Sequence, residues 1–544
     1  MSEKVTVTVK EGKVRGIKKK STFSNTEYYS FFGVPYGQST AGTFRYKDPV
    51  PIKPWKNILD ATIEKKSGCL QFSVHHKCIC GSEDCLYNNI HTPTIPSKGD
   101  PLKAVIVNIH PGGLLHGSPE SWHYGSPELI MHLDIVYISI AYRLHFLGFL
   151  NLGLEECSGN QGLKDIIMGL RWIKDNISVF GGDPDNVTLI GSSTGAAVIH
   201  LIMLSPLAKG LFHKGVMMGG YAFNLLGIFP EDNVTLSTQV LQDLGYGEID
   251  KTDTKKILSI YRKLALEKAI SYRPDRSINS NSGTPFPGSL FLPTVDPGEN
   301  GVLPLHHRKL IETTTRVPIL FGICEKEAVL GFCSGMKAGT TKNFFTAIRN
   351  NYFGWGHNVT DDEIKYIKNQ VEDFYWKGKP IETAPISLKI DIHTDMAYSD
   401  AYNTLINVVA KDLPSSVYIY KFTFEGNAGT LRDVLIGLLG ESVEGTYHAE
   451  DFCYWSKSTN RWDMHDRQYN PETTKMIHTF TKIIGNFAKT GNPNCEDLGT
   501  HWSPSTIEKP CYMKIDKKME LIDGKLNAKR MEFWENLKKE LKKE

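Results

Sequence analysis

Residues 187–204 hold the feature that most constrains this chain, because an apolar strand-like run, a tight turn and a helix-like run follow one another directly. The turn reads G-S-S-T-G over residues 191–195, with Ser193 at its centre. Glycines on both sides let the backbone pass close to neighbouring segments, where a Cβ atom would clash. The pattern predicts a strand–turn–helix unit that lifts the Ser193 hydroxyl above the carboxyl edge of a sheet.

Strand-length apolar runs alternate with longer helical patterns along most of the chain, which predicts an α/β fold. The runs at 104–109 and 135–140 are continuously apolar, as expected of strands buried on both faces of a mostly parallel sheet. Apolar residues recur at three- and four-residue spacing over 162–180, which predicts a helix. Later strands are expected at 317–322 and 417–422, and a docked amphipathic helix at 531–541.

The chain has 544 residues but carries no internal repeat, low-complexity tract or Pro/Gly-rich linker that would divide it. We therefore expect a single domain over residues 1–544. Large helical excursions are expected near 200–310 and 330–415.

The charge balance argues against whole classes of partner. Lysine plus arginine number 62 against 60 acidic residues, so no net field attracts nucleic acid or an anionic membrane. The N-terminal residues alternate like a strand and lack the apolar core of a signal peptide, and no apolar run reaches roughly 18 residues. We expect a cytoplasmic protein that binds neither nucleic acid nor membrane, as a monomer or weak homo-oligomer. A mature secreted form whose leader was removed is the alternative.

The cysteines leave two readings open. Cys69 and Cys85 flank a loop that also holds Cys78 and Cys80. In a reducing compartment these would stay thiols, whereas oxidation would allow a Cys69–Cys85 disulfide. The H-H-K-C-I-C run over residues 75–80 suggests zinc, but structural zinc sites usually present two spaced ligand pairs, so no metal is expected.

A nucleophilic serine needs partners, since its hydroxyl is poorly reactive until a histidine accepts its proton and a carboxylate orients that histidine. Backbone N–H groups must also receive the oxyanion that forms on the substrate. Three segments after predicted strands supply such groups in the order expected for this arrangement. They read H-P-G-G-L at 110–114, I-C-E-K-E at 323–327 and G-T-Y-H-A-E-D at 445–451.

These segments make the chain resemble the carboxylesterase/cholinesterase family of α/β hydrolases (type-B carboxylesterases), and within it the insect intracellular α-esterase-type carboxylesterases most. Further matching stretches run nearly end to end: FFGVPYG, SEDCLYNNIHTP, AYRLHFLGFL, GNQGLKD, FGGDPDNVTLIGSSTGA, GNPN and RMEFWENL. The resemblance implies the α/β-hydrolase fold, with a central, mostly parallel, twisted sheet flanked by helices and large helical insertions. It also implies buried charge-pairing roles for Arg45, Glu83 and Asp165.

The resemblance also implies site residues. Ser193 takes the place of the family's nucleophile, and Glu327 lies five residues after Gly322, as the family's acid does in G-x-x-x-x-E. His448 takes the histidine place in G-x-x-H-x-E-D. The implied oxyanion-hole donors are the backbone N–H groups of Gly112, Gly113 and Thr194. No metal or organic cofactor is implied.

Three positions beside this chemistry depart from the family pattern. Pro111 replaces the first glycine of H-G-G-G, which stiffens or re-aims the loop without removing a donor. Ser192 stands where the family commonly has glutamate in G-E-S-A-G, so we expect weaker stabilisation of charged His448 and slower turnover. Leu226 lies where relatives often carry tryptophan, so we expect bulky acyl groups to be tolerated. Ser192 and Leu226 are thus the predicted pocket residues.

The sequence therefore predicts a serine carboxylic-ester hydrolase that cleaves small to medium hydrophobic esters through an acyl-enzyme. Xenobiotic or lipid ester metabolism, with reactivity toward organophosphates, is the expected setting. The alternative is a catalytically weak or inactive cholinesterase-like protein that binds or sequesters ligands, since some family members keep the fold and lose the serine. Such members typically lack a triad residue and carry a leader and a membrane anchor.

Overall fold

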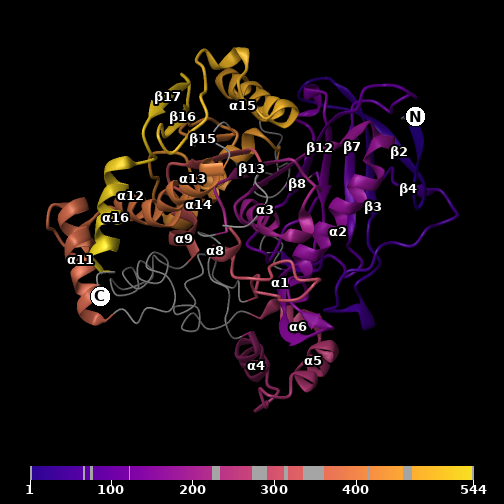
Figure 1. Ribbon diagram of the computed structural model, residues 1–544, viewed down its shortest axis with the longest axis horizontal. Coiled ribbons are helices and arrows are strands. Elements are labelled where there is room, and N and C mark those ends of the chain that lie inside the picture. Colours follow the sequence, from indigo (N-terminus) through magenta and orange to yellow (C-terminus); the bar gives the residue numbers. More distant parts are fainter. Residues whose placement is uncertain are drawn as a thin grey trace.

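The computed structural model describes residues 3–64, 68–73, 78–121, 123–222, 233–272, 291–311, 317–334, 360–412, 416–429, 431–457 and 468–541. One large sheet organises the molecule, with strands in the order β1-β2-β3-β7-β9-β8-β12-β13-β14-β15-β16-β17 and β4 beside β2 (Figure 1). The strands are β1 Lys4–Val9, β2 Gly12–Lys20, β3 Glu27–Pro35, β4 Leu59–Asp60, β7 Tyr87–Thr92, β8 Lys103–Ile109, β9 Val136–Ile140, β12 Gly182–Ser192, β13 Lys214–Met218, β14 Ile319–Cys324, β15 Val417–Phe422, β16 Cys511–Ile515 and β17 Glu520–Asp523.

The centre of this sheet is parallel and its edges are antiparallel. Strands β9, β8, β12, β13, β14, β15 and β16 pair in parallel, so their carboxyl ends meet at one edge. Strands β1, β2, β3 and β7 on one side and β17 on the other pair antiparallel. The predicted mostly parallel sheet is confirmed, and its carboxyl edge is where the loops with candidate site residues emerge.

Helices cover both faces of the central strands. Alternate residues of β8 enter two different cores: Val105 and Val107 pack with α2 (Gln161–Asn176) and α3 (Thr194–Leu204). Ala104 and Ile106 pack on the other face, in the core that contains α15 (Pro471–Thr490). Because a strand's side chains alternate between faces, burial on both sides requires a continuously apolar strand, which explains the run at 104–109.

Several predicted elements differ from the structure at their ends. The strand expected at 317–322 is β14, which begins only at Ile319 and continues to Cys324. Pro318 lacks an N–H for the ladder, although its carbonyl still accepts from Gly215 N at 3.0 Å. The helix expected at 162–180 ends as an α-helix at Asn176 and finishes as a tighter 3₁₀ turn, Ile177–Phe180.

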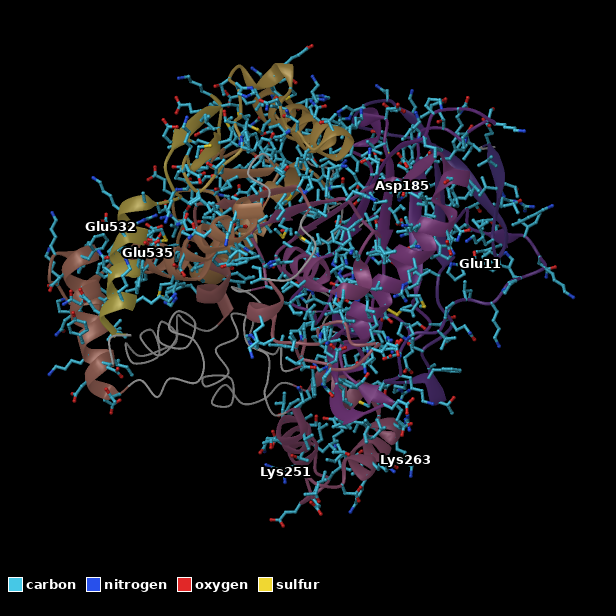
Figure 2. The ribbon with its side chains drawn as sticks, viewed as in Figure 1. Glu11, Asp185, Lys251, Lys263, Glu532 and Glu535 are labelled. Carbon is cyan, nitrogen blue, oxygen red and sulfur yellow. A yellow bond between two sulfur atoms is a disulfide. The ribbon has the colours of Figure 1, made fainter. Side chains whose placement is uncertain are left out.

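The helical excursions lie around the carboxyl edge of the sheet. They include α4 (Asn233–Asp243), α5 (Thr254–Lys263) and α6 (Leu266–Ser271) (Figure 1). Lys251 lies between α4 and α5, and Lys263 is the last residue of α5 (Figure 2). Further helices among the described residues are α1 His145–Phe149, α8 His307–Leu310, α9 Val329–Ser334, α11 Asp361–Trp376, α12 Ile386–Thr394, α13 Asp400–Asp412 and α14 Leu431–Leu439, with a π-helical turn at Asp395–Ser399.

The predicted C-terminal helix is α16 (Ala528–Leu541), and it docks on the body beside α11. Its apolar residues Met531, Trp534 and Leu537 are buried against that neighbour. Glu532 and Glu535 lie on the same helix at the edge of the molecule (Figure 2). Among the described residues, no helix is long and apolar enough to span a membrane.

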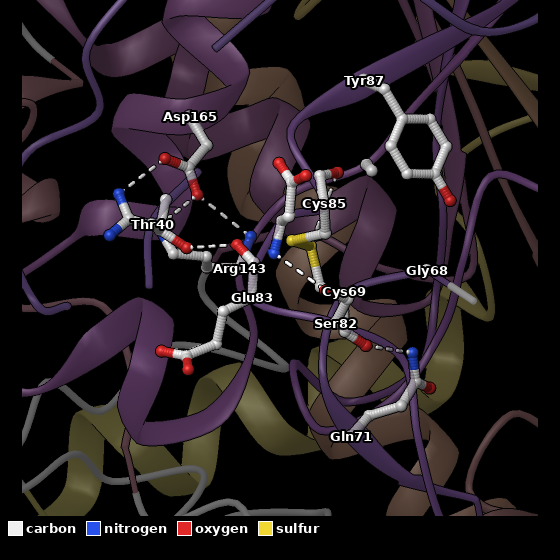
Figure 3. Close-up of a disulfide and its surroundings, with 12 residues drawn as sticks. Thr40, Gly68, Cys69, Gln71, Ser82, Glu83, Cys85, Tyr87, Arg143 and Asp165 are labelled. Carbon is white, nitrogen blue, oxygen red and sulfur yellow. Dashed lines mark hydrogen bonds and ion pairs between the residues drawn. A yellow bond between two sulfur atoms is a disulfide. The ribbon is translucent and has the colours of Figure 1, made fainter. Parts of the chain in front are cut away.

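A disulfide and the Arg143–Asp165 ion pair lie among the neighbouring loops drawn in Figure 3. Cys69 and Cys85 are joined, which resolves the two readings of these cysteines in favour of the bond. Gln71 in this loop exchanges two hydrogen bonds of 2.8 Å with the backbone of Gly117, at the end of the glycine loop. The implied charge-pairing residues form Arg45–Glu83 (2.6 Å) and Arg143–Asp165 (2.7 Å) pairs.

Candidate active site

Ser193 lies at the strained turn between β12 and α3, with φ of 55° and ψ of −129°. Its N–H donates to Met218 O on the neighbouring strand at 2.8 Å. The two flanking glycines are sterically required, since a Cβ on Gly191 or on Gly195 would lie 2.9 or 2.3 Å from Ile109 O. The turn thus brings the serine against the adjacent strand end because no side chain intervenes.

Hydrogen bonds connect the three predicted triad residues in series. His448 Nε2 lies 2.9 Å from Ser193 Oγ, and His448 Nδ1 lies 2.5 Å from Glu327 Oε2. The other oxygen of Glu327 accepts from Cys324 N at 2.7 Å, which holds the carboxylate at the end of β14. All three side chains are nearly or fully buried, and Ser193 retains 5% exposure.

Backbone contacts join the loops that carry Glu327 and His448. Lys326 pairs with Tyr447 in an isolated bridge, and Lys326 N donates to Thr446 O at 2.8 Å. The Thr446 hydroxyl donates to Phe422 O at 2.5 Å, which ties the histidine loop to the end of β15. Two loops 121 positions apart in sequence are therefore bonded to each other and to the sheet edge.

The glycine loop after β8 adopts backbone conformations that favour glycine. Gly112 and Gly113 have φ of 128° and 68°, and Leu114 follows with φ of 59°. A Cβ on Gly112 would lie 1.8 Å from His116 O, so a side chain is excluded there. The N–H of Gly113 donates to the side-chain Oγ1 of Thr194 at 2.8 Å. This contact was not predicted, although a threonine directly after the nucleophile was a readable signal.

Pro111, which departs from the family's H-G-G-G pattern, lies at the start of the glycine loop. His110 stacks on Tyr142 with a ring-centroid distance of 4.2 Å, and the Tyr142 hydroxyl donates to His110 O at 2.8 Å. His110 Nδ1 lies 3.0 Å from Pro111 O. The start of the loop is therefore anchored by an aromatic contact as well as by the proline ring.

Of the two predicted pocket residues, only Ser192 is described, since Leu226 lies outside the described residues. Ser192 is fully buried at the end of β12. Within the described part of the chain, its hydroxyl has no hydrogen-bond partner. Serine at this position carries no charge, unlike the glutamate that the family commonly has there.

Two buried carboxyl groups beside His448 were not predicted to act, although both belong to the G-x-x-H-x-E-D segment. Burial raises the pKa of Asp451 to about 7, and the Glu327 charge adds to that shift. Asp451 accepts from Tyr420 OH at 2.7 Å and from Phe452 N at 2.8 Å. Burial also raises the pKa of Glu450 to about 7, and Glu450 accepts from Tyr447 N at 2.8 Å.

No metal cluster accompanies this site among the described residues, where no three His, Cys, Asp or Glu side chains are arranged to hold an ion. His75 and His76 of the suggested zinc run lie outside the described residues. The groups present are a serine, an imidazole, carboxylates and backbone donors, a set suited to acyl transfer without a cofactor.

Comparison with known proteins finds esterases that are similar over most of the chain. A model of the carboxylesterase family matches residues 3–534. Esterase E4 of Myzus persicae is 31% identical over 492 residues, covering 88% of this chain and 84% of that protein. Juvenile hormone esterase of Heliothis virescens is 29% identical over 519 residues, covering 91% and 87%.

A solved structure is similar over nearly the whole chain. It is juvenile hormone esterase from Manduca sexta with OTFP covalently attached, with a TM-score of 0.81 and 27% sequence identity. The match covers 98% of this chain and 99% of that one. The predicted α/β-hydrolase fold is confirmed, and the chain belongs to the carboxylesterase family.

Proposed function

We propose that this protein is a serine carboxylic-ester hydrolase in which Ser193 is the nucleophile, His448 the general base and Glu327 the residue that orients it. The observation that carries the proposal is the continuous series of hydrogen bonds from Ser193 Oγ through both ring nitrogens of His448 to Glu327. The carboxylate favours the tautomer with a proton on Nδ1, which leaves Nε2 free to accept the serine proton.

In acylation, Ser193 Oγ bonds to the ester carbonyl carbon while its proton passes to His448 Nε2. The carbonyl electron pair moves onto oxygen, and backbone N–H groups of Gly112, Gly113 and Thr194 are the proposed donors to that oxyanion. When the oxyanion collapses, the carbon–alkoxy bond breaks and the alkoxide takes the proton from His448. The products of this half-reaction are the free alcohol and an acyl-Ser193 ester.

Deacylation repeats these steps with water. His448 takes a proton from the water, the resulting oxygen bonds to the acyl carbon, and collapse expels Ser193 with the proton returned from the histidine. The carboxylic acid then leaves. Because the same histidine serves both halves, loss of its partner Glu327 slows both.

We propose small to medium hydrophobic esters as substrates, including xenobiotic or lipid esters. Support comes from the near-complete burial of Ser193 and from the esterases among the relatives, two of them named juvenile hormone esterases. A confined, largely buried nucleophile favours ligands that tolerate desolvation over highly charged ones.

The proposal is tested by labelling with a fluorophosphonate probe and by hydrolysis of a series of p-nitrophenyl esters. The wild-type protein is expected to label and turn over, and Ser193→Ala is expected to do neither while keeping its thermal unfolding midpoint. A wild-type protein that neither labels nor hydrolyses any ester of the series contradicts the proposal.

The same experiment addresses sequestration, which the missing carboxylate at Ser192 and the Gly113–Thr194 contact favour over rapid turnover. A burst of one nitrophenolate per labelled site, followed by a slow steady state, identifies an enzyme that acylates quickly and deacylates slowly. A linear time course from the first turnover identifies an ordinary esterase.

The cytoplasmic location stays a prediction, and the Cys69–Cys85 bond supplies its test. Disulfides persist in oxidising compartments and are rare in the cytosol. Alkylation of thiols in freshly lysed cells, followed by mass spectrometry of the peptide with residues 68–85, distinguishes the reduced pair expected in the cytoplasm from the bond seen here.

A further inference from the structure

The side chain of Thr194 accepts a hydrogen bond from one of the backbone N–H groups proposed to form the oxyanion hole. Its Oγ1 accepts a hydrogen bond from Gly113 N at 2.8 Å. Donors in an oxyanion hole lie about 2.7–3.1 Å from the oxyanion, so the hydroxyl oxygen sits at the distance from Gly113 N that the substrate oxygen would take. One residue therefore contributes a backbone donor and, from its side chain, an acceptor that engages a second donor.

The contact is held by the fold. Thr194 is the first residue of α3 and is fully buried. A β-branched side chain has few χ1 rotamers, and turning the hydroxyl away would bring the methyl group or hydrogen into its place beside Gly113. The backbone of Gly113 is in turn fixed by the glycine loop, which is tied through Gly117 to Gln71.

We infer that Thr194 is a positioning residue that restrains the oxyanion hole by competing with the substrate oxygen for the Gly113 N–H. The inference rests on the proposed function, since it concerns the same hole. In the resting enzyme the hole works with the N–H groups of Gly112 and Thr194. The third donor becomes available only after the hydrogen bond to Oγ1 is broken or shared.

This competition affects the transition state more than the bound ester. A neutral carbonyl oxygen is a modest acceptor, but the oxyanion formed when Ser193 attacks is a strong one, and hydrogen bonds to charged groups are the stronger kind. Breaking the Gly113–Thr194 hydrogen bond during the attack raises the activation barrier. The effect is therefore expected in kcat, with little change in KM.

Thr194→Ala removes the hydroxyl and keeps the backbone donor. We expect kcat/KM for p-nitrophenyl esters to rise by about tenfold, a fraction of the 10²–10³ that one oxyanion donor is worth in kcat. Affinity for an aliphatic trifluoromethyl ketone, which forms a tetrahedral oxyanion with Ser193, is expected to rise by a similar factor. Thr194→Val removes the acceptor but keeps a methyl group against Gly113, so its kcat/KM is expected to fall.

The opposite response of the two variants separates competition from a structural role, in which both would lose activity. Active sites are counted by fluorophosphonate labelling, so a misfolded fraction does not enter kcat. Thr481→Ala is the matched control, because it removes a buried threonine hydroxyl that bonds Ile477 O within α15.

Unchanged or lower kcat/KM and ketone affinity in Thr194→Ala, with wild-type turnover still dependent on Ser193, overturns the inference and leaves the proposed function standing. It would mean that the hydroxyl itself donates to the oxyanion or lies outside its reach. Loss of Ser193-dependent turnover in the wild type instead removes the proposed function.

Discussion

The ring of Tyr420 lies across the backbone of Gly322, its neighbour in register on the adjacent strand. A Cβ on Gly322 would come within 2.2 Å of the ring, so glycine is what allows the tyrosine to lie flat there. From that position the Tyr420 hydroxyl donates to Asp451 at 2.7 Å, three residues after His448. The buried carboxyl group of Asp451 is thereby held close enough to Glu327 that the Glu327 charge adds to the rise in the pKa of Asp451.

Asp451→Asn is expected to alter the pH dependence of turnover. Because the pKa of Asp451 is raised to about 7, the wild-type group is mostly neutral at pH 6 and mostly ionised at pH 8. Ionised Asp451 favours the imidazolium formed during the reaction, so the variant should lose roughly fivefold in kcat at pH 8 and little at pH 6. Measuring kcat from pH 5.5 to 9 checks this, and an equal loss at both pH values argues against an electrostatic role.

Glu327→Gln should leave the fold intact and reduce kcat by roughly 10³–10⁴-fold, because the neutral amide no longer selects the productive tautomer or stabilises the imidazolium. Steady-state hydrolysis of p-nitrophenyl butyrate gives the measurement. Glu325→Gln, on the partly exposed neighbour in the same turn, is the matched control and should retain activity. The reverse ranking would move the acid role to Glu325.

Ser192→Glu is expected to raise kcat by roughly two- to tenfold, since a carboxylate beside the triad favours charged His448. The same change buries a charge where the serine is fully buried, so the unfolding midpoint should fall. Ser192→Ala, which adds no charge, should show no such rise. An unchanged or lower kcat in Ser192→Glu would contradict the prediction that serine at this position slows turnover.

Replacing both Cys69 and Cys85 by serine should lower the free energy of unfolding by about 3 kcal/mol, because the bond closes a loop with a sequence separation of 16. Urea unfolding followed by tryptophan fluorescence measures the change. Cys78→Ser is the control, since Cys78 is a free, exposed thiol in the same loop and should change stability by less than about 0.5 kcal/mol. Equal stability of the double variant and the wild type would mean that the bond is absent in the isolated protein.

Asp165→Asn should destabilise the protein by about 3–5 kcal/mol, because it leaves a buried guanidinium without its ion partner. Arg143 is only 3% exposed and directs two nitrogens at Asp165, at 2.7 and 2.8 Å. The exposed pair Lys517–Glu472 is the contrast, and Glu472→Gln should leave the unfolding midpoint nearly unchanged because solvent screens the pair. Similar losses of stability in both variants would show that burial does not set the contribution of the Arg143–Asp165 pair.

Much of the fold and of the candidate site was predictable because the governing forces are local. The G-S-S-T-G turn follows from sterics within a few residues, and continuous apolar runs such as 104–109 follow from burial on two faces. Segments that follow parallel strands meet at one sheet edge, which is why the three segments could be grouped, whereas the family resemblance singled out Ser193, Glu327 and His448 within them. Strand ends were less well predicted where a proline intervened, as at β14.

The strand–turn–helix around Ser193 and the order of the loops that carry its partners can be read from the chain alone. The contacts of the neighbouring side chains depend on packing between distant parts of the chain. The Thr194 hydroxyl meets Gly113 across 81 positions and Tyr420 meets Asp451 across 31, and the Cys69–Cys85 pair depends on how its loop closes. The physical reason is the range of the interaction: turn sterics act between neighbours along the chain, whereas a hydrogen bond forms only when packing brings two distant groups within about 3 Å.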